Sequence, residues 1–447
     1  MTSVGIDAVE IWTGKLKLDL PNTFAPAQGE DPEKYTKGIG LYASSLPDVY
    51  EDIVTMGANA AKRLMDREGL VPDDIGRIDV ATESAFDNSK PASTYVAGCL
   101  EQVYDGDFHH ANKGERKFAC LAGTQAIDDA YNWIRAGRSR GRAALVIATD
   151  TALYERGDPG EATQGAGAVA MLVDEDPSVV ELSAEQGYGS ADETDFLKPN
   201  QQFPSVDGKR SIQVYLARMR EALEDYEHVA GRTHVEDFEY IPFHTPFPGM
   251  VRKAGLLGYR HMIRDTDLEE ELADEIGRQP READYESWEA YEDAIRDYMD
   301  KLKETERYQR WYARAIEPTL SISREVGNWY TGSVHLARVS ALQAAAAADT
   351  DMVGKKLLVG SYGSGAQAEI HVETVREGWE EAIESISLDE QLTRRYDLSF
   401  EEYEQIHDVH NHELETNLEE FTQPSGEFAF TGWGRMNERK YEWVEER

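Results

Sequence analysis

The chain of 447 residues carries 85 acidic and 46 basic side chains, which gives a formal net charge of −39. This charge repels phosphate backbones and anionic lipid, so we expect no binding to nucleic acid or to a membrane surface. We find no apolar run long enough for a membrane span and no signal peptide, and two cysteines argue against a disulfide framework. We therefore expect a cytoplasmic protein.

The acidic residues are spread along the chain, and 40% of all residues are hydrophobic. This composition favours a folded core under an acidic surface over a disordered acidic tail. Such a surface keeps a protein soluble in concentrated salt, where charge repulsion is screened within a few ångströms. The sequence therefore predicts a cytoplasm that is rich in salt.

Strands and helices alternate in the first part of the chain. The spacing of Ile127, Ala130 and Ile134 predicts a helix that follows Cys120 and ends at Gly137. The other elements expected here are a strand over 4–12, a helix over about 50–67, and strands over 78–82, 143–149 and 165–173.

The second part of the chain repeats this order about 200 residues later. A helix with Leu336 and Leu342 follows Asn328, and we expect strands over 356–360 and 366–372 around a glycine turn at 361–365. A polar residue, a helix, a strand, a glycine turn and a strand thus occur twice. This repetition indicates a duplicated α/β unit with two sheets around shared central helices.

Residues 263–309, approximately, are dense in charged and aromatic side chains, and Pro280 interrupts them. We expect exposed helices in this insertion and no catalytic residue, and the tail from about Leu388 has a similar composition. We place an N-terminal half at 1–178 and a C-terminal half, which includes the insertion, at 179–447.

Cys120 lies in the segment 118–125, just before the predicted helix and among small residues. The positive end of the helix dipole favours a thiolate, and the adjacent N–H groups point at any anion that forms there. An acyl-transfer nucleophile needs this arrangement. A buried structural cysteine is the alternative, because free cysteine is among the most buried residue types.

Three further residues and one loop carry candidate chemistry. Glu83 follows a strand among small and apolar residues, where desolvation raises a carboxyl pKa toward that of a proton shuttle. His244 is fixed between two prolines and two aromatic residues, which suits a positioned donor or acceptor. Asn328 precedes the second helix as Cys120 precedes the first, and the loop 361–365 offers N–H groups for an oxyanion hole. As alternatives, Glu83 would be a capping or salt-bridged residue and His244 a core histidine. Asn328 would be a helix N-cap, and the loop 361–365 an ordinary tight turn.

Two other motifs are misleading. The segment 165–170 matches the G-x-G-x-x-A dinucleotide pattern, but its glycines open a strand, whereas a Rossmann fingerprint opens a helix. His407, His410 and His412 have the spacing of metal ligands, but they lie in a polar tail without a catalytic partner, so we expect a solvated helix face. We expect neither nucleotide nor metal binding from these motifs.

With these residues assembled, the chain resembles the hydroxymethylglutaryl-CoA synthases of the thiolase superfamily over most of its length. The resemblance rests on seven segments in order: ATESA with Glu83, FACLAGTQA with Cys120, TQGAGAVAM at 163–171, VDGKRSIQVY at 206–215, FHTPF at 243–247, GNWYTGS at 327–333 and SYGSG at 361–365. It implies the thiolase-like five-layered αβαβα fold, which agrees with the duplication, and here the second half also carries the charged helical insertion.

The resemblance implies that Cys120 takes an acetyl group from acetyl-CoA and that Glu83 removes a methyl proton from the acetyl thioester. His244 would hold the oxygens of acetoacetyl-CoA, and the product would be 3-hydroxy-3-methylglutaryl-CoA of the mevalonate pathway. The superfamily also implies a homodimer, with no cofactor and no metal. The positions that match substrate-binding residues are Tyr154, Thr163, Ser211, Lys253, Asn328, Ser361 and Ser364.

One departure from the family concerns the cations that bind CoA. The family usually has a second lysine five residues after the histidine, and here that residue is Gly249. Binding of the CoA phosphates would then rely on Lys253, Arg252 or another cation.

Two alternatives to the synthase remain. Cys120, His244 and Asn328 alone would also allow a ketoacyl synthase or a thiolase, but Glu83 favours the synthase. A non-catalytic scaffold with the same fold is disfavoured by the presence of all three catalytic candidates.

We expect the stability of the protein to depend on salt. Lowering the ionic strength lengthens the Debye length from about 3 Å at 1 M to about 10 Å at 0.1 M. Repulsion among the acidic side chains then destabilises the compact state. Thermal denaturation at these two KCl concentrations should give a lower Tm at low salt, and an unchanged Tm would contradict the salt-adapted interpretation.

Overall fold

The computed structural model describes residues 2–199, 201, 203–412 and 420–446. The strands are β1 (Val4–Thr13), β2 (Leu16–Asp19), β3 (Ala43–Leu46), β4 (Ile75–Ala81), β5 (Asn112–Arg116), β6 (Ala143–Ala152), β7 (Gly165–Glu175), β8 (Val180–Ser190), β9 (Phe196–Leu197), β10 (Ser205–Val206), β11 (Lys356–Gly363), β12 (Gln367–Val375), β13 (Tyr396–Asp397), β14 (Glu427–Trp433) and β15 (Arg439–Val444). The α-helices are α1 (Ala25–Gln28), α2 (Ile53–Glu68), α3 (Ala92–Leu100), α4 (Ala122–Arg135), α5 (Gly208–Ala230), α6 (Pro248–Ile263), α7 (Asp267–Ile276), α8 (Trp288–Leu302), α9 (Glu306–Ala315), α10 (Ser321–Val326), α11 (Ser333–Ala347), α12 (Trp379–Glu384), α13 (Leu388–Thr393) and α14 (Phe400–His412). Within these residues no helix combines the length and the apolar character that a membrane span requires.

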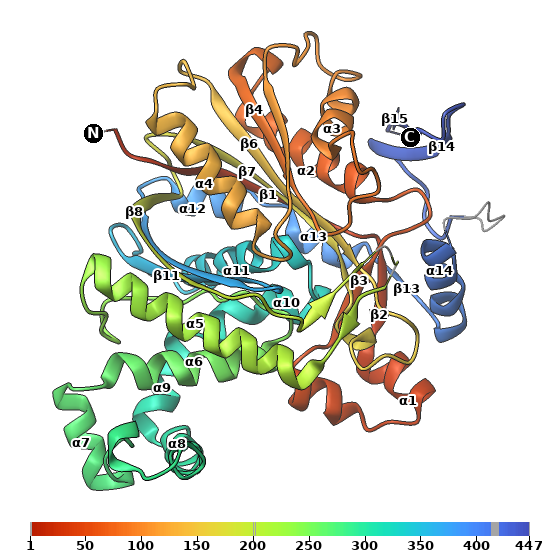
Figure 1. Cartoon of the computed structure of the whole chain (residues 1–447). Coiled ribbons are helices and arrows are strands. Elements are labelled where there is room, and N and C mark those ends of the chain that lie inside the picture. The colour runs from red at the N-terminus through yellow and green to blue at the C-terminus, as the bar shows by residue number, and fades with distance from the viewer. Residues whose placement is uncertain (1, 200, 202, 413–419, 447) are drawn as a thin grey trace.

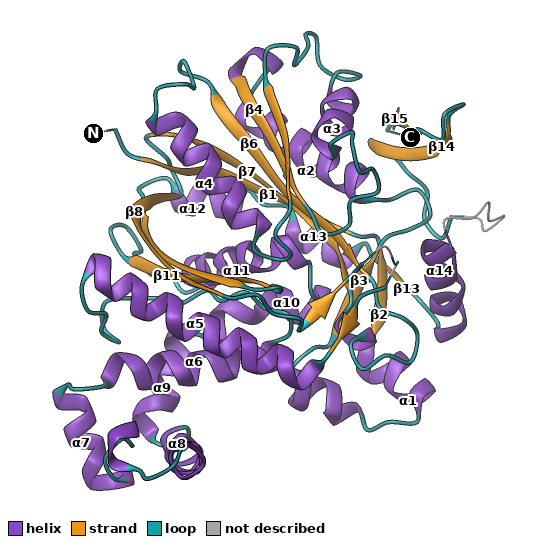
Figure 2. Cartoon of the chain, in the orientation of Figure 1, coloured by secondary structure: helices purple, strands orange, loops and turns teal. Residues whose placement is uncertain are grey.

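Helices and strands form five layers (Figures 1 and 2). Eight strands are hydrogen-bonded in the order β11-β12-β8-β1-β7-β6-β4-β5. Strands β1 and β8 pair at two positions, Gly5 with Glu181 and Ile6 with Val180, so the sheet has two parts. Helices α2 and α3 cover the outer face of one part, α5 and α6 cover the outer face of the other, and α4 and α11 lie between them. The predicted five-layer architecture is confirmed.

The central hydrophobic cluster packs α4 and α11 against both parts of the sheet. It includes Ala126 and Ile127 of α4 and Val339 and Leu342 of α11. Strands β6 and β7 are almost continuously buried, because helices cover both of their faces. The order α4-β6-β7 recurs as α11-β11-β12, so the duplication is confirmed. Strand β11 runs through Gly363, and the glycine turn predicted over 361–365 is therefore shorter than expected.

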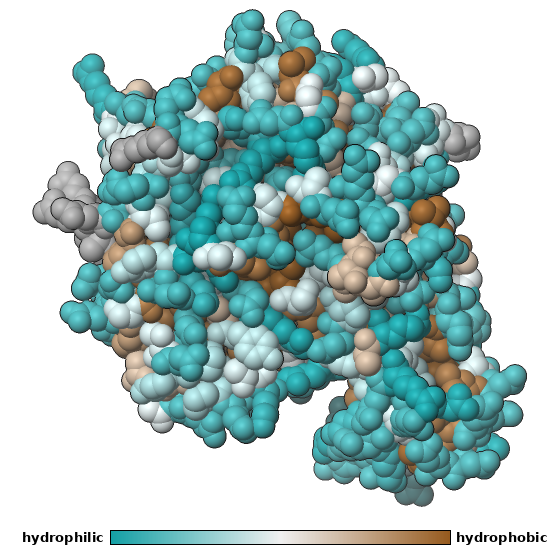
Figure 3. All heavy atoms as spheres, turned by 180° about the vertical axis from the view of Figure 1, so that it is seen from behind, coloured by the Kyte–Doolittle hydropathy of each residue, from teal (hydrophilic) through white to brown (hydrophobic). Residues whose placement is uncertain are grey.

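The charged insertion forms the helices that the sequence predicts. Helices α7, α8 and α9 project as a lobe from the body, at the lower left of Figure 1 and the lower right of Figure 3, where hydrophilic residues cover most of it. Trp288, at the start of α8, is 56% exposed.

The expectation of a similarly exposed tail is wrong. The buried Gln391 of α13 accepts a hydrogen bond from Thr13 N of β1 at 2.9 Å. Phe428 of β14 is fully buried, and its backbone N–H donates to Asn59 Oδ1 of α2 at 2.7 Å. Polar and aromatic residues of the tail therefore find partners on the body, which their composition alone does not reveal.

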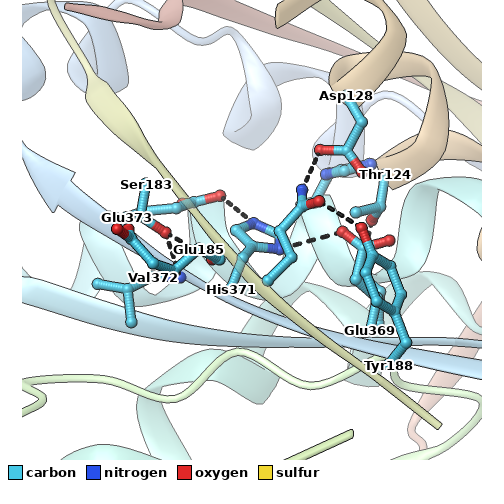
Figure 4. Close-up of polar contacts among 12 residues, drawn as sticks. Thr124, Asp128, Ser183, Glu185, Tyr188, Glu369, His371, Val372 and Glu373 are labelled. Carbon is cyan, nitrogen blue, oxygen red and sulfur yellow. Dashed lines mark hydrogen bonds and ion pairs between the residues drawn. The ribbon is translucent and has the colours of Figure 1, made fainter. Parts of the chain in front are cut away.

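A charged cluster is buried between α4, α11 and β12 (Figure 4). Arg338 Nε donates to Glu373 Oε2 at 2.7 Å, and neither side chain is more than 1% exposed. His371 lies between Glu373 and Glu369, and although burial lowers its pKa, the two carboxylates raise it to about 10. Burial and the neighbouring Glu369 raise the pKa of Asp128. Arg338 and His371 therefore face two carboxylates, and this buried cluster joins the central helices to the sheet.

Candidate active site

Cys120 lies in the turn that leads into α4 and is partly exposed. Ala119 before it has a φ of +44°, a conformation that costs a residue with a Cβ about 1–2 kcal/mol. Gly363 packs against the same turn, since an added Cβ would lie 2.5 Å from the Phe118 carbonyl oxygen and 3.0 Å from Leu121 N. The end of β11 is thereby held beside the cysteine.

Glu83 follows β4 and meets the cysteine directly. Its Oε1 accepts a hydrogen bond from Cys120 Sγ at 2.8 Å. Burial, with a smaller contribution from Asp150, raises the pKa of Glu83 to about 8, in line with the desolvation expected from its apolar neighbours.

Burial and the Glu83 carboxylate also raise the pKa of the Cys120 thiol. The expectation that the helix dipole favours a thiolate at Cys120 is therefore wrong for the site without substrate, because desolvation and a neighbouring carboxylate outweigh the dipole. The thiol keeps its proton and presents it to Glu83.

Asp150 is a buried carboxylate that was not predicted as a site residue. Its Oδ1 accepts from Glu83 N at 2.7 Å and from the hydroxyls of Thr82 and Ser84 at 3.0 and 2.9 Å. Its Oδ2 accepts from Thr331 N at 3.0 Å and from Thr331 Oγ1 at 2.6 Å. Asp150 thus fixes the backbone of the Glu83 loop and ties it to the second repeat. A carboxylate at the end of an apolar strand is the signal that could have identified it.

His244 is 2% exposed and is held at both ends of its backbone. Its N–H donates to Gly360 O at 2.7 Å, and Tyr215 OH donates to its carbonyl oxygen at 2.9 Å. The ring Nδ1 lies 2.6 Å from Ser333 Oγ. Burial lowers the pKa of His244 to about 3, so the imidazole is neutral. Ser333 and Tyr215 were not predicted, because their contacts join segments far apart in the sequence.

Tyr154, Thr163 and Asn328 come together beside the Cys120–Glu83 pair. Asn328 N donates to Thr163 O at 3.0 Å, and Asn328 Oδ1 accepts from Tyr330 N at 2.9 Å, which is a local turn contact of the capping kind. Burial raises the pKa of Tyr154 and of Tyr330, and Cys120 and Glu83 contribute to both shifts. Tyr330 has a φ of +41° and was also missed.

The three predicted serines lie at different depths. Ser361 is buried in β11, with its Oγ 2.6 Å from Thr124 Oγ1 in the first turn of α4. Ser364 follows the close contact of β11 with the cysteine turn and is half-buried. Ser211 lies in the first turn of α5, one turn before Tyr215. No hydrogen bond joins its side chain to Cys120 or Glu83 in the part of the chain that the structure describes.

The cations after His244 differ in their contacts. Arg252 Nη2 donates to the carbonyl oxygens of Lys37 and Gly38 at 2.8 and 2.7 Å. Lys253 is exposed, and no ion pair of its side chain is found among the described residues. Gly249 packs so closely that an added Cβ would lie 2.8 Å from Gly38 O, which explains why no lysine stands at this position.

The glycine-rich motif and His407 of the tail serve the packing of the protein. Gly167, near the start of β7, packs on Trp329, since an added Cβ would lie 2.3 Å from the indole carbons. His407 is buried, with Nε2 2.8 Å from Tyr154 O, so the expectation of a solvated face is wrong there. The side chains of His410 and His412 lie outside the described part of the structure. In that part, no group of three or more His, Cys, Asp or Glu side chains could hold a metal ion.

Comparison with known proteins places this site in a family. The model described as Hydroxymethylglutaryl-coenzyme A synthase N terminal matches residues 1–178, and the corresponding C-terminal model matches residues 187–430. The hydroxymethylglutaryl-CoA synthase of Haloferax volcanii is 79% identical over 445 residues, which cover 100% of each chain. Hydroxymethylglutaryl-CoA synthase A of Dictyostelium discoideum is 29% identical, over 88% of this chain and 80% of that protein.

Solved structures give the same result. MvaS in complex with 3-hydroxy-3-methylglutaryl coenzyme A has a TM-score of 0.84 and 30% identity, over 99% of this chain and 100% of that chain. The HMG synthase of the curacin biosynthetic pathway in complex with acetyl donor-ACP has a TM-score of 0.78 and 26% identity, with the same coverage. These matches select the synthase over the ketoacyl synthase and the thiolase. The chain belongs to the hydroxymethylglutaryl-CoA synthase family.

Proposed function

We propose that this protein condenses acetyl-CoA with acetoacetyl-CoA and water to give 3-hydroxy-3-methylglutaryl-CoA and CoA. The observation that carries the proposal is the 2.8 Å contact between the Cys120 sulfur and the Glu83 carboxylate. A thiol that touches a general base is the pair that acyl transfer followed by proton abstraction requires.

Cys120 is the proposed nucleophile. As its sulfur attacks the acetyl carbonyl of acetyl-CoA, the thiol proton passes to Glu83 and then to the departing CoA sulfur, so that Glu83 is again a carboxylate. The backbone N–H groups of Cys120 and Ser364 would stabilise the oxyanion, and later the enolate oxygen of the acetyl group.

Glu83 then removes a methyl proton from acetyl-Cys120. Its raised pKa makes it a stronger base than an ordinary carboxylate. The carbanion forms a bond to the ketone carbon of acetoacetyl-CoA, and the alkoxide takes up a proton that balances the one removed. Water finally breaks the thioester bond to Cys120 and restores the thiol.

His244 would stabilise the alkoxide by donating a hydrogen bond from Nε2. A neutral ring can donate from Nε2 only if Nδ1 is unprotonated. The single proton of the Ser333 hydroxyl, which lies 2.9 Å from its acceptor Tyr330 O and 2.6 Å from Nδ1, would then turn to Nδ1. Ser333 is thus a positioning residue for His244. We assign the substrate pocket to Tyr154, Thr163, Ser211, Asn328, Ser361 and Ser364, and the CoA phosphates to Lys253.

We further propose the setting in which the enzyme works. The product would feed the mevalonate pathway to isoprenoids in a salt-rich cytoplasm. The enzyme would be a homodimer, and each protomer would consist of two halves that meet near residue 178. The chemistry above needs no metal and no cofactor beyond the CoA thioesters.

Replacing the nucleophile tests the proposal directly. Cys120→Ala should abolish acetyl-enzyme formation, because no thiol remains at the site, while the fold is kept by a small residue. Mass spectrometry after incubation with acetyl-CoA measures the acetyl adduct. Cys99→Ala, at the other cysteine, is the matched control and should acetylate normally. An acetyl adduct on another residue of Cys120→Ala would show that Cys120 is not the nucleophile. If the parent enzyme were acetylated by an acetylated acyl carrier protein but not by acetyl-CoA, acetyl-CoA would not be the donor.

Glu83→Ala should separate the two steps. Burial and the Glu83 carboxylate both raise the pKa of Cys120, so the loss of Glu83 removes one obstacle to the thiolate, and acetylation should survive with water in place of Glu83 as the proton carrier. Condensation should fall by about 10²- to 10⁴-fold, because the proton acceptor is lost. In the parent enzyme the condensation rate should fall as the pH drops below about 8, since Glu83 must be ionised to act as a base. Normal turnover by Glu83→Ala would disprove the assignment.

Lys253→Ala should raise the KM for acetyl-CoA much more than it lowers kcat, because a contact with a remote phosphate contributes mainly uniform binding. The effect should shrink as KCl rises, since an exposed ion pair is screened. Arg252→Ala is the control, because the Arg252 side chain binds the carbonyls of Lys37 and Gly38. If steady-state kinetics showed a raised KM for Arg252→Ala but not for Lys253→Ala, Arg252 and not Lys253 would be the residue that binds the CoA phosphates.

A further inference from the structure

The charged insertion encloses a polar cavity of about 70 Å³ against the body of the protein. Helices α5 and α6 supply one side of the cavity, and Gln279 and Tyr291 of the insertion supply the other. The side chains that decide its character are Arg220, Glu224, Arg260, Arg264, Gln279 and Tyr291. The cavity therefore exists only because the insertion folds back on the two helices.

Arg260 is the central group of this cavity. The amide of the buried Gln279 faces its guanidinium, and in the amide orientation that satisfies both groups the Gln279 carbonyl oxygen accepts from Nε and Nη2 at 3.0 and 3.2 Å. No carboxylate lies within 4 Å of Arg260 in the described part of the chain. Burial lowers the pKa of Arg260, and the positive charge of Arg264 adds a smaller contribution. A half-buried arginine without a carboxylate is unexpected in a chain with 85 acidic residues.

The other two arginines have weak partners. Arg264 Nε is buried without a hydrogen bond, and its nearest carboxylate, Asp265, is 3.8 Å away and also pairs with Arg281 at 2.9 Å. Arg220 is 3.9 Å from Glu224, and both side chains are about half exposed. Among the residues that line the cavity, three guanidiniums face one carboxylate, which is an excess of two positive charges. His261, which also lines the cavity, pairs with Glu227 at 2.9 Å.

We propose that this cavity binds a dianion of the phosphate class, either inorganic phosphate or a phosphate monoester. Arginine presents its donors in a planar fork that matches the oxygens of such an anion. A dianion would balance the two remaining charges and give Arg264 Nε an acceptor. It would also relieve the repulsion between Arg260, in the last turn of α6, and Arg264, which directly follows that helix.

The arrangement also explains a role for the insertion, which contains none of the proposed catalytic residues. Its Gln279 orients Arg260 and its Tyr291 lines the cavity, so a bound anion would hold the lobe against α5 and α6. The proposed site does not depend on the proposed condensation reaction, since it shares no residue with it.

Phosphate binding is tested with the full-length protein in KCl at constant high ionic strength. Inorganic phosphate and glycerol 3-phosphate are titrated separately, with Tm and the ³¹P line width as readouts. We expect a saturable rise in Tm and a broadened ³¹P signal, and the tighter of the two probes identifies the source of the anion. Arg260→Gln should weaken the apparent Kd by about tenfold or more, the loss expected for a charge-assisted hydrogen bond.

Two further variants keep the test decisive. Arg264→Gln, at a side chain that is 38% exposed, should also weaken binding, so that the test does not depend on the folding of Arg260→Gln. Arg296→Gln removes an exposed arginine of the same lobe, 3.1 Å from Asp293, and should bind as the parent does. The proposal is overturned if neither probe gives a saturable effect, or if all three variants bind phosphate like the parent.

Discussion

Five hydrogen bonds to one buried carboxylate, Asp150, connect the two repeats at the site. One oxygen fixes the loop that carries Glu83, and the other fixes Thr331, which lies in the turn between Asn328 and α11. A carboxylate in this position has to be fully satisfied, because an unpaired buried charge costs several kcal/mol. The positions of Glu83 and of the second repeat are therefore coupled, and the geometry of the site depends on this one group.

Burial is the main cause of the pKa shifts of all three proposed catalytic groups. It raises the pKa of Glu83 and of Cys120 and lowers that of His244, so each group tends toward its neutral form. The three reacting groups thus hold little charge although the protein is strongly acidic. Anionic CoA thioesters would meet repulsion from the surface of the protein, but hardly from the reacting groups.

The sequence predicts the parts of the fold that depend on local pattern. The strands over 143–149 and 165–173 are continuous apolar runs, and the structure places both in the centre of the sheet. Glu83 and Cys120 stand out because each follows or precedes a regular element. Asp150 and Ser333 escape such reasoning, since their partners are about 70 to 180 residues away. The packing of the tail escapes it for the same reason. The helix dipole does not produce a thiolate at Cys120, because desolvation and the neighbouring carboxylate outweigh it.

The tail also determines when the site can form. Tyr403 OH of α14 donates to Glu161 Oε1 at 2.6 Å, Gln164 Nε2 donates to Tyr403 OH at 2.9 Å, and His407 contacts Tyr154 O. These contacts support the loop that carries Tyr154 and Thr163. A ribosome that adds roughly 5–20 residues per second releases α14 long after that loop. The nascent chain therefore holds its nucleophile well before the loop beside it is supported, and the complete site arises only once α14 has been made.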